Sequence, residues 1–322
     1  MRVLAVRDGQ LSFEERPLPE PKSGEVRIAV RAIGINHVDL LQRVGKHPPP
    51  QGASDLLGLE VAGEVEEVGP NCSTVSKGDL VMALLPGGGY AEAVCVHESH
   101  LIPIPHNLTV EEAAAIPEAF LTSYQALFMI GEIAPNSHLL LHAAASGVGT
   151  AAIQLARAFD AKVIATTRST DKADAILSLG ADHVIHPQEG RFAKKVLSAT
   201  EGHGADLILD FVGAAYFEEN MDAMAQGGAL IFLATQGGPK PPVFDLRSLM
   251  KKWATISGTT LRNRPDTYKA KLIAEFSRFA LSRLEAKTLK PVVHTILPWE
   301  QGEEAHELLR QNAIIGKIVL TT

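Results

Sequence analysis

Hydrophobic residues in the first third of the chain fall in short runs that Gly, Pro, Asn and Asp interrupt. Runs of this kind are typical of β-strands. They predict strands over residues 2–7, 11–15, 25–35, 63–68, 80–84 and 90–97. Residues 1–117 are therefore expected to form a compact, β-rich domain.

A different pattern begins near residue 118, where apolar runs alternate with segments of helical spacing. Strands are predicted over residues 138–143, 162–167, 183–186, 206–212, 229–234 and 254–258. Helices are predicted between them, over residues 150–159, 171–179, 191–199, 217–225 and 245–253. Six strands separated by helices are typical of a doubly wound parallel sheet. Residues 118–261 therefore predict an α/β nucleotide-binding domain of the Rossmann type.

The last sixty residues predict a mixed segment. A long helix is expected from Asp266 to about Leu284, then a strand over 292–296, a helix over 303–310 and a final strand over 317–321. We assign residues 262–322 to the first domain, which would then consist of residues 1–117 and 262–322.

A turn of small residues, Ala-Ala-Ser-Gly-Val-Gly at 144–149, lies between the first strand of the α/β domain and its helix. It matches the dinucleotide pattern G-x-G-x-x-G only loosely, because Ala and Ser occupy the first two glycine positions. Small residues there would let the backbone approach a pyrophosphate, which N–H groups at the helix N-terminus would bind. Ser146, Gly147, Val148 and Gly149 are therefore predicted to bind a cofactor.

The end of the second strand of this domain predicts which dinucleotide binds. An Asp or Glu there would bind the ribose 2′-hydroxyl of NAD, whereas a basic residue accommodates a 2′-phosphate. This strand ends in Thr166, Thr167 and Arg168, Lys172 follows one turn later, and no carboxylate occurs before Asp171. We predict NADPH, bound by Thr167, Arg168 and Lys172. The alternative is that the two basic residues are ordinary surface charges.

Length, charge and cysteine content narrow the class of protein. The chain has 322 residues, enough for two domains, and a formal net charge of −7, which opposes non-specific binding to nucleic acid or anionic membranes. No run approaches the ~18 apolar residues of a membrane span, and the N-terminus lacks the apolar core of a signal peptide. Two cysteines favour a reducing compartment, so we expect a cytoplasmic protein.

Six segments carry a resemblance that runs through the whole chain: residues 34–40 (GINHVDL), 58–65 (GLEVAGEV), 84–92 (LLPGGGYAE), 115–122 (AIPEAFLT), 142–149 and 316–320 (GKIVL). With them, the chain resembles the medium-chain dehydrogenase/reductase superfamily, in its zinc-free, zeta-crystallin-like quinone oxidoreductase branch. Within that branch it looks most like the NADPH quinone oxidoreductase type that a tumour suppressor induces in animals. The resemblance implies a GroES-like catalytic domain beside the Rossmann domain.

The residues at the zinc positions of this superfamily predict the reaction. Its alcohol dehydrogenases bind catalytic zinc with a Cys in the first of these segments and a His in the second, where this chain has Asn36 and Leu59. Glu60 alone cannot supply three ligands, so we expect no metal, although His37 and His47 remain possible ligands. Reduction of a quinone or conjugated carbonyl needs only a positioned hydride and a proton.

Asn36 and His47 are the catalytic candidates. The Asn36 amide can donate a hydrogen bond to a carbonyl oxygen without titrating. His47 stands where the family usually has a Tyr, and its imidazole can deliver a proton near neutral pH. An exposed His in a Pro-rich loop is an equally good interpretation of His47. We expect Glu60 to be structural, paired with a cation.

The resemblance also implies further cofactor contacts. Most of them come from residues near the strand ends of the α/β domain, and one comes from the last predicted strand of the chain. These residues are Thr122, His186, Phe232, Leu233, Ser257, Thr259 and Lys317. For Lys317 a plain surface lysine is an alternative.

Together these features predict an NADPH-dependent quinone reductase that transfers hydride to a quinone in the cleft between its domains. A 2-enoyl thioester or alkenal reductase is an alternative, which a basic groove for a CoA phosphate would favour. A structural or regulatory NADPH-binding protein without turnover is another. Relatives form homodimers or homotetramers, so the strands predicted at 229–234 and 254–258 could extend a sheet across a two-fold axis.

Overall fold

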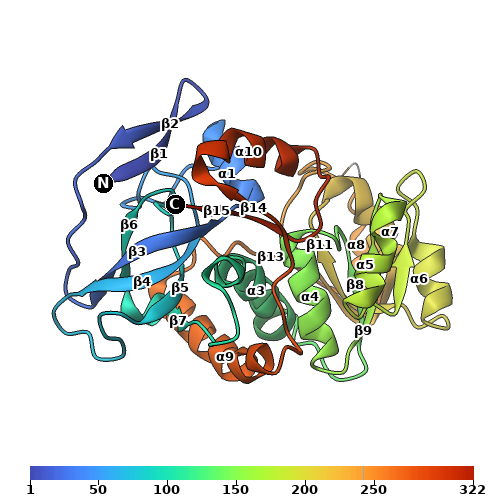
Figure 1. Cartoon of the computed structure of the whole chain (residues 1–322). Coiled ribbons are helices and arrows are strands. Elements are labelled where there is room, and N and C mark those ends of the chain that lie inside the picture. Colours follow the sequence, from blue (N-terminus) through green and yellow to red (C-terminus); the bar gives the residue numbers. More distant parts are fainter. Residues whose placement is uncertain (242) are drawn as a thin grey trace. The chain divides into compact units, whose positions relative to one another are not determined.

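The computed structural model describes residues 1–241 and 243–322 of the chain (Figure 1). It divides into two compact units. The β-rich unit comprises Met1–Leu121 and Leu261–Thr322, and the nucleotide unit comprises Thr122–Thr260.

The β-rich unit is built on a mainly antiparallel sheet with the strand order β14-β15-β3-β4-β5-β7, and β6 pairs with β3. Its strands are β3 (Glu25–Gly34), β4 (Glu60–Val68), β5 (Leu80–Leu84), β6 (Ala93–His97), β7 (Leu101–Pro103), β14 (Val293–Pro298) and β15 (Lys317–Thr321). A hairpin of β1 (Arg2–Arg7) and β2 (Gln10–Glu15) precedes them. Alternate residues of β3 and β4, among them Val26, Ile28, Val61 and Val65, are buried in one core with Ile318.

The helices of this unit include three that the sequence pattern did not predict: α1 (His37–Arg43), α2 (Val110–Ala114) and the first part of α3 (Pro117–Tyr124). Two of them are capped by nearby side chains. The Asp39 carboxylate accepts a hydrogen bond from the N–H of Asn36, and Thr109 and Glu112 cap each other at α2. The pairs Asn-x-x-Asp and Thr-x-x-Glu resemble capping boxes, a signal that could have revealed both helices.

The C-terminal part of the β-rich unit has the predicted elements. The long helix α9 (Asp266–Glu285) precedes β14, and α10 (Gly302–Arg310) connects it to β15. β14 and β15 run parallel, and β15 pairs antiparallel with β3. This pairing places the last strand of the chain beside one of the first.

The nucleotide unit contains the predicted doubly wound parallel sheet, in the strand order β10-β9-β8-β11-β12-β13. Its strands are β8 (His138–Leu141), β9 (Lys162–Thr166), β10 (His183–Ile185), β11 (Ala205–Asp210), β12 (Met224–Phe232) and β13 (Thr255–Gly258). The connecting helices are α4 (Gly147–Arg157), α5 (Ala173–Ser178), α6 (Ala193–Ala199), α7 (Phe217–Ala223) and α8 (Leu246–Lys252). This strand order is that of dinucleotide-binding folds, whose ligands bind where the order reverses, here between β8 and β11.

Several elements of this unit begin earlier than predicted, among them β12, which starts at Met224 instead of residue 229. The helix after β8 starts at Gly147 instead of residue 150, because the Ser146 hydroxyl caps it by accepting a hydrogen bond from Gly149 N–H (3.0 Å). Gly147, Val148 and Gly149 are therefore the first turn of α4, not a loop before it. The correction places their N–H groups at a helix N-terminus, where anions bind.

Candidate functional site

The glycine turn holds α4 tightly against the end of β8. A Cβ atom added at Gly149 would lie 2.6 Å from the carbonyl oxygens of both Ala143 and Ala144. Only glycine allows this approach. The N–H groups of the first helical turn have no partner within the helix, so the turn fits the pyrophosphate of a dinucleotide.

The end of α3 lies against the same turn. The hydroxyl of Ser123 donates a hydrogen bond to the carbonyl oxygen of Val148 (2.9 Å). Thr122, predicted as a cofactor contact, directly precedes it in the helix and is half-buried. The contact of Ser123, which the sequence did not indicate, therefore brings Thr122 beside Ser146–Gly149.

The residues predicted to bind the 2′-phosphate gather at the ends of β9 and β10. The His186 ring lies 3.0 Å from the carbonyl oxygen of Thr167. Arg168 is exposed, whereas Lys172 is buried, and burial lowers the Lys172 pKa. The interpretation of Lys172 as a solvated surface charge is therefore wrong. Burial raises the pKa of Tyr216, and the nearby Arg168 cation opposes that shift, which places a further candidate beside Arg168.

Four other predicted cofactor contacts lie at the ends of the last two strands. Ser257 pairs with Ile231 across β12 and β13, and the N–H of Thr259 donates to the carbonyl oxygen of Phe232 (3.0 Å). The N–H of Leu233 donates to the carbonyl oxygen of Asp210, at the end of β11 (2.8 Å). The fold thus brings Phe232, Leu233, Ser257 and Thr259 to one edge of the sheet.

A buried polar network that the sequence did not predict joins three strand ends at this edge. His142 lies 2.9 Å from the Thr166 hydroxyl and 2.7 Å from the Asn220 side-chain oxygen. The Asp210 carboxylate accepts hydrogen bonds from Asn220 and from the N–H groups of residues 212 and 213. Burial lowers the His142 pKa, so the imidazole is neutral at pH 7. Asp210 therefore orients the loop after β11.

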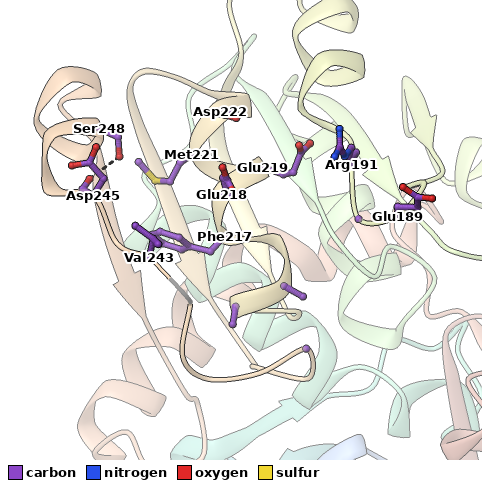
Figure 2. Close-up of a pocket in the computed structure, with 14 residues that line it drawn as sticks. Glu189, Arg191, Phe217, Glu218, Glu219, Met221, Asp222, Val243, Asp245 and Ser248 are labelled. Carbon is purple, nitrogen blue, oxygen red and sulfur yellow. Dashed lines mark hydrogen bonds between the residues drawn. The ribbon is translucent and has the colours of Figure 1, made fainter.

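A hollow of about 940 Å³ lies between α7 and the segments around residues 190 and 245. Figure 2 shows side chains that line it. Its lining carries five carboxylates and, among the described residues, one basic side chain, Arg191; the acids are Glu189, Glu218, Glu219, Asp222 and Asp245. The Glu219 carboxylate accepts hydrogen bonds from the N–H groups of Phe192 and Ala193, at the start of α6. An acidic lining repels phosphates, so the cofactor phosphates fit the glycine turn and not this hollow.

In the β-rich unit, Asn36 belongs to a cluster with Glu60 and Lys317. The Asn36 amide donates to Glu60 Oε1 (2.8 Å), and its oxygen accepts from Lys317 Nζ (2.6 Å). Lys317 Nζ also lies 2.6 Å from Glu60 Oε1. The reversed amide would face its NH₂ to an ammonium and its oxygen to a carboxylate, so these two charges fix its orientation.

Both charges of this cluster are buried. Glu60 is 0% exposed and Lys317 is 5% exposed, so the alternative of a surface lysine is wrong and the expected structural pairing of Glu60 is confirmed. The three N–H donors of Lys317 meet three oxygens, on Ile35, Asn36 and Glu60. In this structure the Lys317 ammonium therefore contacts and orients the Asn36 amide.

Glu118, a residue that the sequence analysis did not single out, lies in the same cluster. Its N–H donates to Glu60 Oε2 (2.8 Å). Burial, followed by the negative charge of Glu60, raises the pKa of the Glu118 carboxyl to about 8. At pH 7 this group is a carboxylic acid that can donate a proton.

A chain of buried polar groups holds the start of α1, where Asn36 is the N-cap residue. An Arg43 N–H faces His306 Nδ1 (3.3 Å), which must accept, so the Nε2 of this imidazole carries the proton and faces the Tyr90 hydroxyl (2.9 Å). Burial lowers the His306 pKa to about 4, consistent with a neutral ring. The hydroxyl is then free to donate to Asp39 (3.4 Å), whose carboxylate binds the N–H of Asn36.

The structure weakens the role predicted for His47. Burial and the Arg262 cation lower the His47 pKa, so its imidazole is neutral at pH 7 and has no acidic proton to deliver. Arg262 is itself buried and donates to the Pro86 carbonyl oxygen and to Gln42 Oε1, both at 2.7 Å. This buried guanidinium is a polar group of the unit that the sequence pattern could not show, because its partners are distant in sequence.

Comparisons with known proteins agree with this architecture. The family model described as alcohol dehydrogenase GroES-like domain matches residues 22–106, and the one described as zinc-binding dehydrogenase matches residues 147–278. A quinone oxidoreductase of Sus scrofa is 30% identical over 94% of this chain and 91% of its own length. The chain belongs to the medium-chain dehydrogenase/reductase superfamily. It is an oxidoreductase of that superfamily, whose members use nicotinamide dinucleotides.

Solved structures of this superfamily have the same fold. An NAD-dependent alcohol dehydrogenase is 33% identical with a TM-score of 0.87, and a mycobacterial protein complexed with NADPH is 28% identical with a TM-score of 0.90; both alignments cover all of both chains. The CurK enoyl reductase is 25% identical with a TM-score of 0.87, over 99% of this chain and 98% of its own. No helix among the described residues is long and apolar enough to cross a bilayer.

Proposed function

We propose that this oxidoreductase reduces quinones with NADPH, by hydride transfer that uses no catalytic zinc ion. The observation that carries the proposal is the Asn36 amide, which Lys317 and Glu60 orient at the position where alcohol dehydrogenases of the superfamily have a zinc-binding Cys. Leu59, at the His position, is buried and apolar. An amide and an alkyl side chain do not bind zinc, but an amide N–H stabilises a developing oxyanion.

Asn36 is proposed to donate a hydrogen bond to the quinone oxygen. The Lys317 ammonium on its Oδ1 withdraws electron density from the amide, which strengthens the Nδ2 donors. One of these donors has only a long hydrogen bond, to the Gly34 carbonyl oxygen (3.3 Å), and is the one we assign to the substrate. Lys317 and Glu60 are positioning residues in this proposal, which replaces the cofactor contact expected of Lys317.

Glu118 is proposed as the proton donor in place of His47. When bound, NADPH supplies the hydride, which leaves a hydroquinone anion that needs one proton. A carboxyl group with a pKa of about 8 is protonated at pH 7 and acidic enough to protonate a phenolate. Solvent then returns the proton to Glu118.

The cofactor is proposed to bind on the nucleotide unit, its pyrophosphate on the first turn of α4 and its 2′-phosphate beside Arg168 and Lys172. The support for NADPH over NADH is the pair of basic residues after β9, with the hydroxyl of Thr167 and the ring of His186 next to them. Both cysteines are free thiols, which suits a reducing compartment, and we propose the cytoplasm.

The test measures NADPH oxidation with an ortho-quinone, a para-quinone and an enoyl-CoA, each repeated with NADH. We expect turnover of at least one quinone with NADPH, and a kcat/KM that falls above about pH 8 as Glu118 loses its proton. The Glu118→Gln variant should be slower and lack this pH limb. Turnover of the enoyl thioester alone would contradict the proposed substrate, and an unchanged pH profile in Glu118→Gln would contradict the proposed donor.

A second candidate, enoyl thioester reduction, is favoured by the similarity to the CurK enoyl reductase. The acidic hollow beside α7 is no groove for a CoA phosphate, so we place this activity second. The enoyl-CoA arm of the same assay distinguishes the two. A cofactor-binding protein without turnover would bind NADPH but oxidise it with none of these acceptors.

A further inference from the structure

Two histidines and an aspartate, from two segments that are distant in sequence, meet at the amino edge of the sheet in the nucleotide unit. His138 is the first residue of β8, Asp206 is the second residue of β11, and His203 lies in the turn before β11. The cofactor turn follows the opposite, carboxyl end of β8. This cluster is therefore separate from the site described above.

The three side chains present their ligand atoms to one point. One nitrogen of each imidazole and a carboxylate oxygen all lie within 4.8 Å of one another. His203 Nε2 is 2.7 Å from Asp206 Oδ1, and His138 Nδ1 is 3.5 Å from Asp206 Oδ2. In a tetrahedral site with bonds of about 2.1 Å, neighbouring ligand atoms lie ~3.4 Å apart. Small side-chain adjustments would bring all three to that spacing.

A second observation points to a ligand at this place. His138 Nδ1 is buried and has no hydrogen-bond partner among the described residues, although a carboxylate oxygen lies nearby. A buried polar atom without a partner destabilises the folded state. The hydrogen bond between His203 Nε2 and Asp206 Oδ1 satisfies those two atoms but leaves His138 Nδ1 unsatisfied. A cation bound between the three side chains would satisfy all of them.

We propose that His138, His203 and Asp206 bind one divalent transition-metal ion of the Zn²⁺ class. Imidazole nitrogen with a single carboxylate suits Zn²⁺, Co²⁺, Ni²⁺ and Cu²⁺, whereas Mg²⁺ and Ca²⁺ prefer sites made of oxygen. The half-exposed side of His203 leaves room for water as the remaining ligand. The sequence analysis predicted no metal in this chain, and this proposal revises that prediction for the nucleotide unit.

The bound ion would stabilise the nucleotide unit. Asp206 already accepts a hydrogen bond from the N–H of His138 (2.7 Å), so the ion would reinforce an existing link between the starts of β8 and β11. An ion that binds the folded state and not the unfolded state raises the unfolding temperature, and the rise grows with the logarithm of the ion concentration above its Kd. The proposal does not depend on the reaction that the protein catalyses.

The test is titration of the full-length, untagged and chelator-treated protein with Zn²⁺ by calorimetry, and with Co²⁺ by its visible absorbance. Three variants are compared with the wild type: His203→Ala, Asp206→Asn and, as a control, His183→Ala. His183 is an exposed histidine at the same edge of the same sheet, at the start of β10. The His203 side chain is 53% exposed, so its replacement should leave the fold intact, which circular dichroism verifies.

We expect one saturable ion per chain in the wild type and in His183→Ala. Binding by His203→Ala and Asp206→Asn should be at least ~10-fold weaker, since loss of even an outer partner of a metal site costs about 10- to 100-fold. Zn²⁺ should raise the unfolding temperature of the wild type and the control only. The proposal is overturned if the wild type shows no saturable binding, if His203→Ala binds as tightly as the wild type, or if His183→Ala loses the ion equally.

Discussion

Asn36 illustrates how single residues of this protein depend on buried charges. An isolated amide can flip at little cost, but the Lys317 ammonium on its oxygen and the Glu60 carboxylate on its nitrogen permit one orientation. Removing one member of a buried ion pair leaves the other charge desolvated without compensation. The cluster therefore makes both the orientation of Asn36 and the stability of the unit sensitive to one lysine.

Replacement of Lys317 by Met should lower the free energy of unfolding by about 3–5 kcal/mol, because it leaves Glu60 charged and buried. Urea unfolding measures the change. The matched control is Lys77→Met, at an exposed lysine, which should change stability by less than about 0.5 kcal/mol. The double variant Lys317→Met/Glu60→Gln should recover part of the loss. Equal stability of the Lys317 and Lys77 variants would show that Lys317 does not compensate the buried charge of Glu60.

Glu118 should impose a pH dependence on stability. Its pKa is raised from 4.5 to about 8 in the folded state, so between these values the folded protein binds more protons than the unfolded chain. Stability from this group is therefore present at low pH and falls as pH rises from about 4.5 to 8, by at most ~1.4 kcal/mol per pH unit. Urea unfolding of Glu118→Gln at several pH values should show a smaller decline. Glu304→Gln, at an exposed carboxylate, should keep the wild-type slope.

Arg168 should determine the preference for NADPH. Loss of a hydrogen bond to a charged group costs about 1.5–3 kcal/mol. Arg168→Ala should therefore lower kcat/KM for NADPH at least ~10-fold and leave the value for NADH nearly unchanged. Arg191→Ala, at another exposed arginine of the same unit, is the control and should change neither value. A parallel loss with both cofactors would show that Arg168 does not contact the 2′-phosphate.

At the scale of elements, the junction of β8 and α4 is tightly packed. The N-cap residue of α4, Ser146, is replaceable. The Ser146→Ala variant loses one hydrogen bond and should lower the free energy of unfolding by about 1 kcal/mol. The glycine of this junction is not replaceable, because the carbonyl oxygens 2.6 Å from a Cβ at Gly149 belong to the backbone and cannot rotate away.

Gly149→Ala should therefore displace α4 from the end of β8. We expect a loss of stability of about 1–3 kcal/mol, typical of overpacking, together with weaker NADPH binding. Thermal unfolding and a fluorescence titration with NADPH measure the two effects. Ser146→Ala serves as the milder comparison at the same junction. If Gly149→Ala binds NADPH as well as Ser146→Ala does, close packing at this turn is not required for the cofactor.

At the scale of the whole molecule, the surface near β13 indicates that copies of this chain associate with one another. β13 is an edge strand of its sheet, and the segment before it exposes large apolar side chains: Val243, Phe244, Leu246, Met250 and Trp253. Exposed apolar residues beside an open sheet edge favour pairing with a second copy, as the sequence analysis suggested for this strand.

We expect a homodimer or homotetramer in light scattering. Met250→Glu/Trp253→Glu should convert it to monomer, because each chain would bury two carboxylates that face the same pair of its partner across the two-fold axis. Val44→Glu changes an exposed apolar residue of the other unit and should not alter the mass. A monomeric wild type, or an unchanged mass in the double variant, would exclude this surface as the interface.

Local patterns in the sequence were enough to predict most elements and the position of the glycine turn. Strand and helix periodicity, turn residues and the basic residues after β9 are local features, and local features are visible in a single chain. The parallel sheet of the nucleotide unit follows from the alternation of strand and helix, but the order of its strands does not. The capping pairs of α1 and α2 were equally local and were overlooked.

Which polar groups meet depends on the tertiary fold and not on local sequence. Lys317 and Asn36 are 281 positions apart, and they touch because β15 lies beside β3, which lies beside β4 and Glu60. The raised pKa of Glu118, the neutral state of His47 and the meeting of His138 with Asp206 likewise depend on burial and on distant neighbours. Hydrophobic patterning fixes which face of a strand is buried, but it does not specify which charges the completed fold removes from water together.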